Sequence, residues 1–167
     1  MASDQHTTEP NGVQRTASYH SQETPHTLRP GHSEDSADRR RLIRTVLVVD
    51  DDAMFLELIR KVLEREGLSV RTARDGVEAV TVYTTGYKEI DLVISDIGLP
   101  RLDGGAAMKL MRGINPAVKV MLVSGHLDEE KRILMINAGA DECISKPNPP
   151  EDILEHVHRF LSPDPGS

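Results

Sequence analysis

The chain has 167 residues and a formal net charge of −7, and its single cysteine, Cys143, excludes an intramolecular disulfide. This length predicts one folded domain with appendages. The acidic balance without a basic patch argues against nucleic-acid binding. Because no segment has the apolar length of a signal peptide or a transmembrane helix, we expect a cytoplasmic chain without membrane contact.

The first part of the chain is polar. Residues 1–41 are rich in Ser, Thr, His, Arg, Pro and acidic residues and have almost no large aliphatic side chains. Such a segment cannot bury enough apolar surface to offset the entropy lost on ordering. We therefore expect a disordered tail over 1–41, a folded domain over 42–161 and a flexible C-terminal tail over 162–167.

From Thr45 onward, patterns typical of strands and of helices alternate. The apolar run 45–49 predicts a buried strand, and an amphipathic helix follows from about Ala53 to Glu66, where Gly67 ends it. We expect the later strands over 68–73, 92–96, 118–124 and 142–145, and the later helices over about 75–86, 103–115, 128–137 and 149–161.

Five strands and five helices in strict alternation predict an α/β fold. Right-handed crossovers make it a doubly wound, five-stranded parallel sheet of the flavodoxin type, in the order 2-1-3-4-5, with helices on both faces. This order places the first and third strands side by side. On the fourth helix, Ile133 and Ile136 belong either to the core or to an interface, and we favour the core. The sequence leaves open whether the chain forms a homodimer.

Carboxylates follow two of these strands. Asp50, Asp51 and Asp52 come after the first strand, and Asp96 ends the third. Two carboxylates about 4 Å apart repel by roughly 4 kcal/mol at an effective dielectric constant near 20, so a cation is expected between them. A set of oxygen ligands suits Mg²⁺. Ser124 and Lys146 end the fourth and fifth strands at the same sheet edge.

Four sequence motifs occur in order: VLVVDDD, LVISDIGLPRLDG, MLVSG and AGADECISKP. Together they resemble the receiver domain of two-component response regulators, CheY-like and of the stand-alone type, over about residues 42–161. The resemblance implies that Asp96 accepts a phosphoryl group from a phosphohistidine of a sensor histidine kinase or a histidine phosphotransfer protein. It also implies that Asp50 and Asp51, with Asp96, hold Mg²⁺.

The same resemblance implies that Ser124 and Lys146 bind the phosphoryl oxygens of the product. Such a chain is a signalling receiver and not a conventional enzyme, although it catalyses its own phosphorylation and dephosphorylation. Phosphorylation would switch a surface that an unidentified downstream protein reads. The family often has a cis peptide bond after the lysine, here between Lys146 and Pro147.

Three further positions bear on how closely the chain follows the family pattern. Cys143 stands where the family usually has Tyr or Phe, which puts the usual aromatic relay in doubt. Gly98 and His126 lie two residues beyond Asp96 and Ser124, at positions that tune phosphorylation and hydrolysis rates in the family. His126 is either a solvated loop residue or, as we hypothesise, a source of pH sensitivity.

Two alternative functions stay open. A phosphorylation-independent interaction module would keep the fold and lose the switch, which Cys143 favours and the complete set of site residues argues against. A haloacid-dehalogenase-like phosphohydrolase would use the D-x-D formed by Asp50 and Asp52. The chain lacks the length of a substrate cap, and Asp96 has no place in that pattern.

Overall fold

The computed structural model describes residues 43–162. The predicted tail over 1–41, and all of the predicted C-terminal tail except Ser162, lie outside the described residues. Within them, strands and helices alternate as predicted: β1 Thr45–Val49, α2 Ala53–Arg65, β2 Ser69–Ala73, α3 Gly76–Gly86, β3 Ile90–Asp96, α4 Gly104–Ile114, β4 Val120–Ser124, α5 Glu129–Asn137, β5 Glu142–Ser145, a 3₁₀ turn η1 Pro150–Asp152 and α6 Ile153–Leu161.

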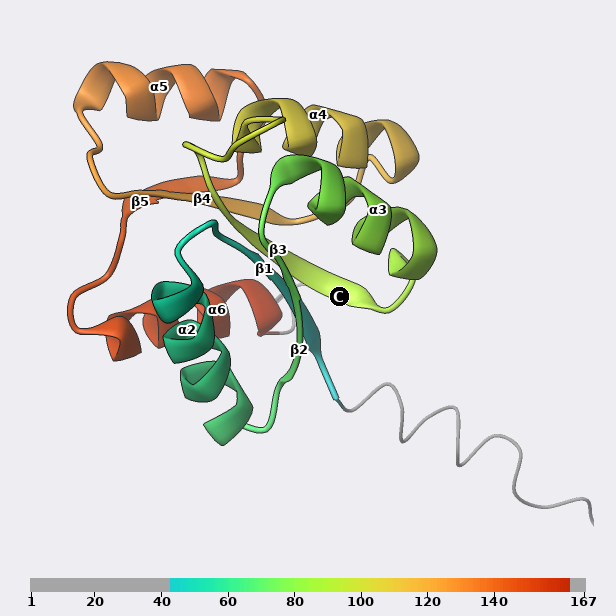
Figure 1. The fold of residues 1–167 in the computed structure, drawn as a ribbon, viewed down its shortest axis with the longest axis vertical. Coiled ribbons are helices and arrows are strands. Elements are labelled where there is room, and N and C mark those ends of the chain that lie inside the picture. Colours follow the sequence, from blue (N-terminus) through green and yellow to red (C-terminus); the bar gives the residue numbers. More distant parts are fainter. Residues whose placement is uncertain (1–42, 163–167) are drawn as a thin grey trace, which may run out of the picture. The chain divides into compact units, whose positions relative to one another are not determined.

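The five strands form one parallel sheet in the order β2-β1-β3-β4-β5, which confirms the predicted topology. The register pairs Val49 with Ser95, Asp96 with Val123, and Ser124 with Ser145. Helices α2 and α6 cover one face of the sheet, and α3, α4 and α5 cover the other (Figure 1). The carboxyl ends of β1, β3, β4 and β5 therefore lie along one edge.

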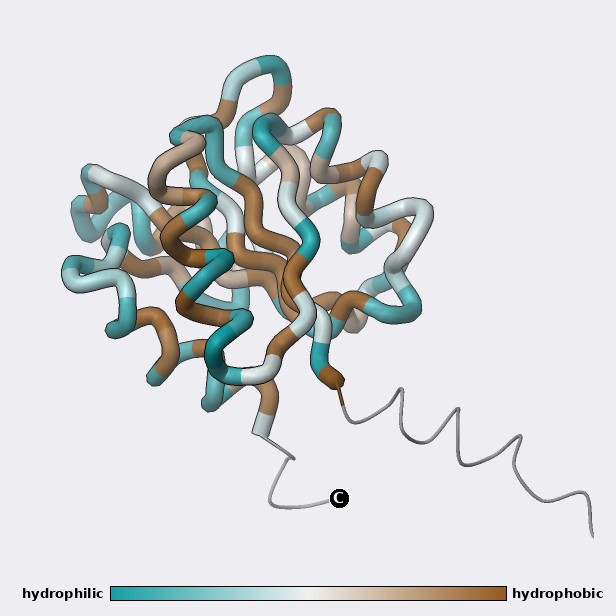
Figure 2. The backbone as a smooth tube through the Cα atoms, turned by 60° about the horizontal axis from the view of Figure 1, so that its bottom comes forward, coloured by the Kyte–Doolittle hydropathy of each residue, from teal (hydrophilic) through white to brown (hydrophobic). Residues whose placement is uncertain are grey.

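The core consists of two apolar clusters, one on each face of the sheet. The central strands are apolar on both faces, since every residue of β1 and β4 is buried, as expected for a parallel sheet covered on both sides. Figure 2, in which hydrophobic residues are brown, shows these residues gathered in the middle of the domain. Met108 and Met111 pack on the α4 side, and Leu63 and Val157 pack on the α2 and α6 side.

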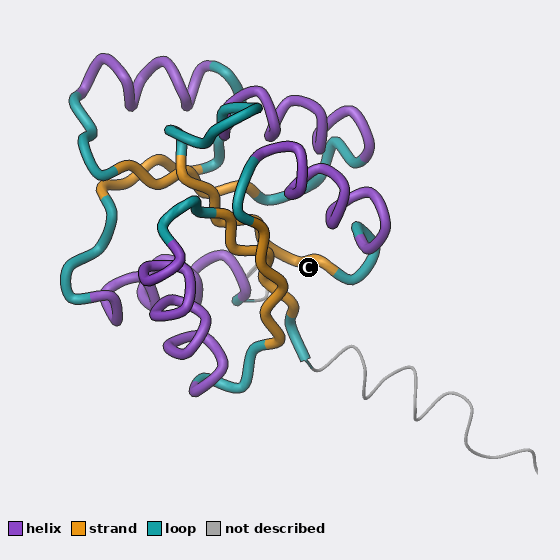
Figure 3. Tube along the Cα trace, in the orientation of Figure 1, coloured by secondary structure: helices purple, strands orange, loops and turns teal. Residues whose placement is uncertain are grey.

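Figure 3 shows where the helices begin and end. Local sequence signals set most of these helix ends. The carboxylates of Asp52, Asp75, Asp103 and Asp128 cap α2, α3, α4 and α5, accepting hydrogen bonds from backbone N–H groups of the first turn. Gly67, with φ of +79°, follows the end of α2 in the left-handed region that glycine adopts without strain.

Some element boundaries differ from the prediction. Strand β3 begins at Ile90 instead of residue 92, because Ile90 pairs with Thr45 beyond a register irregularity in the ladder. Strand β4 begins at Val120 instead of residue 118. The last helix opens with a 3₁₀ turn, and its α-helical part starts only at Ile153.

The prediction that Ile133 and Ile136 belong to the core is wrong. Their exposed fractions are 49% and 38%, and α5 has no fully buried residue. Met135 and Ala138 are the α5-side residues that pack against the core, so the helix turns the two isoleucines outward. Their apolar surface is open to solvent in this structure.

The predicted cis bond between Lys146 and Pro147 is also wrong. The cis peptide bond of the described residues joins Asn148 to Pro149 instead. No helix in the described part of the chain is long and apolar enough to cross a membrane.

Candidate functional site

Asp50 follows β1 and is fully buried, with 0% exposure. Its backbone N–H donates to the carbonyl of Ala73, 3.1 Å away, which continues the pairing with β2. Its Oδ1 accepts a hydrogen bond of 2.9 Å from the backbone N–H of Asp52. Its Oδ2 is also buried and lies 2.7 Å from Lys146 Nζ.

Asp51 and Asp96 complete an acidic cluster with Asp50. One carboxylate oxygen from each residue can be chosen so that all three lie within 4.8 Å of one another. Asp96 is the last residue of β3 and only 8% exposed, and its Oδ1 accepts a 3.1 Å hydrogen bond from the Gly98 N–H. The order of the strands thus brings together carboxylates that are far apart in the sequence.

Asp52 is not part of this cluster. Its Oδ1 accepts hydrogen bonds from the backbone N–H groups of Met54 and Phe55, at 2.9 and 3.2 Å. The third carboxylate of the Asp-Asp-Asp run is therefore the N-cap of α2, and only the first two face the site.

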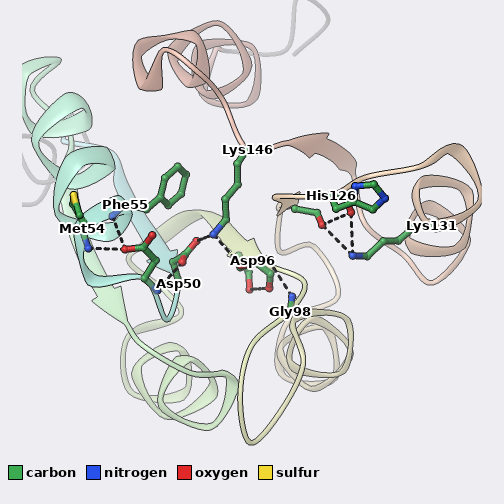
Figure 4. Close-up of polar contacts among 11 residues, drawn as sticks. Asp50, Met54, Phe55, Asp96, Gly98, His126, Lys131 and Lys146 are labelled. Carbon is green, nitrogen blue, oxygen red and sulfur yellow. Dashed lines mark hydrogen bonds and ion pairs between the residues drawn. The ribbon is translucent and has the colours of Figure 1, made fainter.

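Lys146 joins the two strand-end carboxylates. It follows β5, and its backbone N–H donates to the Ser124 carbonyl at 2.8 Å. Its Nζ lies 2.7 Å from Asp50 Oδ2 and 3.0 Å from Asp96 Oδ2, so one ammonium forms ion pairs with both carboxylates (Figure 4). The Lys146 side chain is 22% exposed, which leaves this contact largely shielded from water.

The protonation equilibria reflect this arrangement. Burial is the largest influence on Asp50 and raises its pKa above the usual value, although Lys146 and the Asp52 N–H oppose the rise. Burial lowers the pKa of Lys146, but its contacts with Asp50 and Asp96 outweigh burial, and the pKa is raised. The site therefore holds excess negative charge that one lysine only partly compensates.

The donor set fits a hard divalent cation. All three clustered residues offer carboxylate oxygens, without nitrogen or sulfur, which suits Mg²⁺. The buried Asp50 carboxylate, which already binds the Lys146 ammonium, has further lone pairs with which it could bind a cation. Asp51 is exposed, so a cation held here would keep contact with water.

Ser124 ends β4 at the predicted edge of the sheet, but its hydroxyl does not bind the acidic cluster and instead contacts His126 and Lys131. Its Oγ donates to the His126 carbonyl oxygen at 2.8 Å and accepts from Lys131 Nζ at 3.0 Å. Figure 4 shows the contacts of His126 and Lys131 as a group separate from those of Asp96. Ser124 itself is buried, with 3% exposure.

The three positions singled out beside the resemblance have different surroundings. Gly98 is exposed and contributes its N–H to Asp96. His126 is exposed, and its backbone carbonyl, not its imidazole, takes part in the hydrogen bonds of this region. Cys143 is 5% exposed and belongs to the core cluster beneath α5, and burial raises the pKa of its thiol.

Sequence reasoning missed three contributors to the site. The ring centroid of Phe55 lies 4.7 Å from Lys146 Nζ, a cation–π contact. Lys131 binds the Ser124 hydroxyl. Gly104 lies so close to the Asp96 carbonyl oxygen that a side chain there would overlap it. The only sequence signal was for Phe55, which lies on the predicted apolar face of its helix.

Comparisons with known proteins agree with this geometry. The model of the response regulator receiver domain family matches residues 46–158. The chain is 34% identical over 116 residues to the transcriptional regulatory protein CpxR homolog of Haemophilus influenzae, covering 70% of this chain and 49% of that protein. It is 32% identical over 116 residues to response regulator MprA of Mycobacterium tuberculosis, covering 70% and 50%. The chain thus spans about half the length of these curated relatives.

Solved structures show the same fold. A response regulator receiver domain protein from Clostridium thermocellum superposes with a TM-score of 0.67 at 30% identity, covering 71% of this chain and 94% of that one. A chain of the CheX–CheY–BeF₃–Mg²⁺ complex from Borrelia burgdorferi gives a TM-score of 0.68 at 27% identity, covering 74% of this chain and 98% of that one.

The parallel sheet defines a doubly wound α/β domain, and an acidic cluster that could hold a metal ion lies at its switch point. With the family match over residues 46–158, the chain belongs to the response regulator receiver domain family of two-component systems.

Proposed function

We propose that this receiver accepts a phosphoryl group on Asp96 from a phosphohistidine of a sensor histidine kinase or a histidine phosphotransfer protein. The observation that carries the proposal is the contact of one ammonium, Lys146 Nζ, with both Asp50 and Asp96 beside the exposed Asp51. This arrangement keeps a carboxylate nucleophile at the end of a strand, next to groups that neutralise charge.

In the transfer step, a carboxylate oxygen of Asp96 attacks the phosphorus of the phosphohistidine. A P–O bond forms, the P–N bond breaks, and the imidazole nitrogen leaves with the electron pair and gains a proton from solvent. Phosphoryl transfer passes through a loose transition state, so alignment and charge neutralisation supply most of the catalysis. Later attack of water on phosphorus returns the carboxylate and inorganic phosphate.

Asp50, Asp51 and Asp96 would hold Mg²⁺ in this proposal. The bound cation would neutralise negative charge of the phosphoryl group and of the carboxylates. Lys146 stays beside Asp96 and contributes a second positive charge. The N–H of Gly98 already donates to Asp96 Oδ1 and helps to fix the orientation of the carboxylate.

The phosphorylated site would bind the Ser124 hydroxyl and so change the surface around β4, β5 and α5. A phosphoryl group adds nearly two negative charges and three acceptor oxygens.

The partners of this proposal are the phosphohistidine protein and an unidentified downstream protein or a second copy of this chain. The exposed Ile133, Leu134 and Ile136 of α5 support such a contact surface. We place the exchange in the cytoplasm.

The receiver is not a conventional enzyme in this proposal, because its own Asp96 is the substrate. The family assignment favours it over the dehalogenase-like phosphohydrolase. The phosphorylation-independent interaction module is the remaining alternative, and partner binding that is unchanged by Asp96→Asn would support it.

The test is intact mass spectrometry after incubation with acetyl phosphate, with and without Mg²⁺. We expect one added phosphoryl group on the wild type only with Mg²⁺, and none on Asp96→Asn. Asp103→Asn is the matched control, because asparagine caps a helix as well as aspartate does, so this variant should react like the wild type. Equal labelling of Asp96→Asn, or no labelling of the wild type, would contradict the proposal.

A further inference from the structure

The Ser124 hydroxyl is engaged in a small network at the start of α5. Its single proton is donated to the His126 carbonyl oxygen, and a lone pair of the same oxygen accepts from Lys131 Nζ. Lys131 Nζ also donates to the His126 carbonyl at 3.3 Å. The three groups therefore stabilise one another in a single arrangement of the loop after β4.

Lys131 is itself anchored at the helix start. Its backbone N–H donates to Asp128 Oδ1 at 2.7 Å, the capping hydrogen bond of α5. The side chain is half-buried. The ammonium therefore links the Ser124 hydroxyl directly to the first turn of α5.

On β5, the strand that pairs with β4, position 143 is a cysteine and not an aromatic residue. Cys143 pairs with Leu122 across the sheet and lies in the core beneath α5. Burial, the largest influence, raises the pKa of its thiol, while the charges of Lys131 and Arg132 act in the opposite direction. The small Cys143 side chain thus lies on the strand that pairs with β4, the strand that ends in Ser124.

We propose that Lys131 is a positioning residue that holds the Ser124 hydroxyl away from Asp96 in the unmodified receiver and couples its release to α5. This inference rests on the proposed function. To donate its proton to a phosphoryl oxygen on Asp96, Ser124 must leave the His126 carbonyl, and its contact with Lys131 breaks at the same time. The first turn of α5 then loses its tie to the loop.

The direction of the effect follows from this exchange. The Lys131 contact exists only in the unmodified arrangement, so its removal favours the arrangement with an occupied site. A hydrogen bond from a charged donor corresponds to roughly a three- to tenfold change in an equilibrium constant when it is half-buried and partly replaced by water.

The experiment titrates the full chain with beryllium fluoride, a phosphoryl analogue, at saturating Mg²⁺ and follows the amide signals of α5 by NMR. Lys131→Met keeps an unbranched side chain of nearly the same length and removes its charge and its N–H donors. We expect its titration midpoint to fall roughly three- to tenfold below that of the wild type. The α5 signals of the unloaded variant should also move toward their loaded positions.

Three further variants separate this role from a structural one. Lys131→Arg keeps a charged donor and should behave like the wild type. Lys109→Met removes an exposed lysine of α4 and controls for the change in net charge. In a Ser124→Ala background, Lys131→Met should have no further effect, because the contact it removes is already absent.

The outcomes distinguish the inference from the proposed function. No binding of beryllium fluoride by the wild type would contradict the proposed function and the inference together. Binding by the wild type with an equal or higher midpoint for Lys131→Met would overturn the inference alone. An effect of Lys131→Met that persists in the Ser124→Ala background would overturn it as well.

Discussion

The contact of Lys146 with two carboxylates leads to a quantitative prediction for Lys146→Met. The substitution keeps an unbranched side chain against the Phe55 ring and removes the ammonium that lies 2.7 Å from Asp50 and 3.0 Å from Asp96. Without it, and without a metal ion, the two carboxylates face each other with no positive charge between them.

The magnitude follows from the geometry. Carboxylate oxygens within 4.8 Å of one another repel by about 3.5 kcal/mol at an effective dielectric constant of 20. Side-chain rotation and entry of water reduce this cost, since Lys146 is partly exposed. We expect Lys146→Met to lower the free energy of unfolding of the metal-free protein by about 2–3 kcal/mol at neutral pH.

The effect should depend on pH. Burial, the main cause, raises the pKa of Asp50 above its ordinary value of 3.8, so the folded state binds this proton more tightly than the unfolded state does. Stability from this group is therefore present at low pH and is lost as the pH rises through the raised pKa. Removal of Lys146 increases that loss, so the difference between variant and wild type should be larger at about pH 7 than at about pH 4.

The assay is urea unfolding followed by circular dichroism, with a chelator and then with Mg²⁺. Mg²⁺ should stabilise Lys146→Met more than the wild type, because the cation then replaces the missing charge. Lys61→Met is the control, since its ion pair with Glu57 is exposed to solvent and should contribute little to stability. Equal stability of Lys146→Met and the wild type, together with an equal response to Mg²⁺, would refute the reasoning.

Three other substitutions test single contacts of the site. Gly104→Ala should lower the free energy of unfolding by about 1–3 kcal/mol, because its Cβ would overlap the backbone at the end of β3. Gly113→Ala is the control, because its Cβ meets no atom within 4 Å, and it should be neutral or stabilising. Phe55→Leu removes the ring beside Lys146 and should slow labelling by acetyl phosphate several-fold, about 1 kcal/mol, while the free energy of unfolding changes little. An unchanged labelling rate would exclude a contribution of this contact to the reaction. His126→Ala should flatten the pH profile of dephosphorylation, and an unchanged profile would reject the pH-sensitivity hypothesis.

The sequence was sufficient to predict the sheet and the acidic cluster. The strand order and the alternation of elements are confirmed. Apolar runs of strand length, two of them ending in carboxylates, specify which side chains lie at one edge once the crossovers are right-handed. Asp50, Asp51 and Asp96 could therefore be grouped before any coordinates were known, and they lie together.

The prediction was wrong or silent where the answer depends on packing between distant segments. The exposure of Ile133 and Ile136 depends on how α5 is rotated over the sheet edge, and its apolar pattern does not specify this rotation. The cis bond lies at Asn148–Pro149 instead of after Lys146, and the sequence has three X-Pro bonds between residues 146 and 150 without a local signal to choose among them.

What the sequence by itself determined is the class of the domain and the composition of its acidic site, because hydrophobic periodicity and strand-end residues are local properties of the chain. Only the tertiary structure decided that Lys146 contacts both carboxylates and Phe55, and that the Ser124 hydroxyl contacts Lys131. These contacts join side chains of different elements. Their directions depend on how helices and loops pack on the sheet, a property that no single stretch of sequence contains.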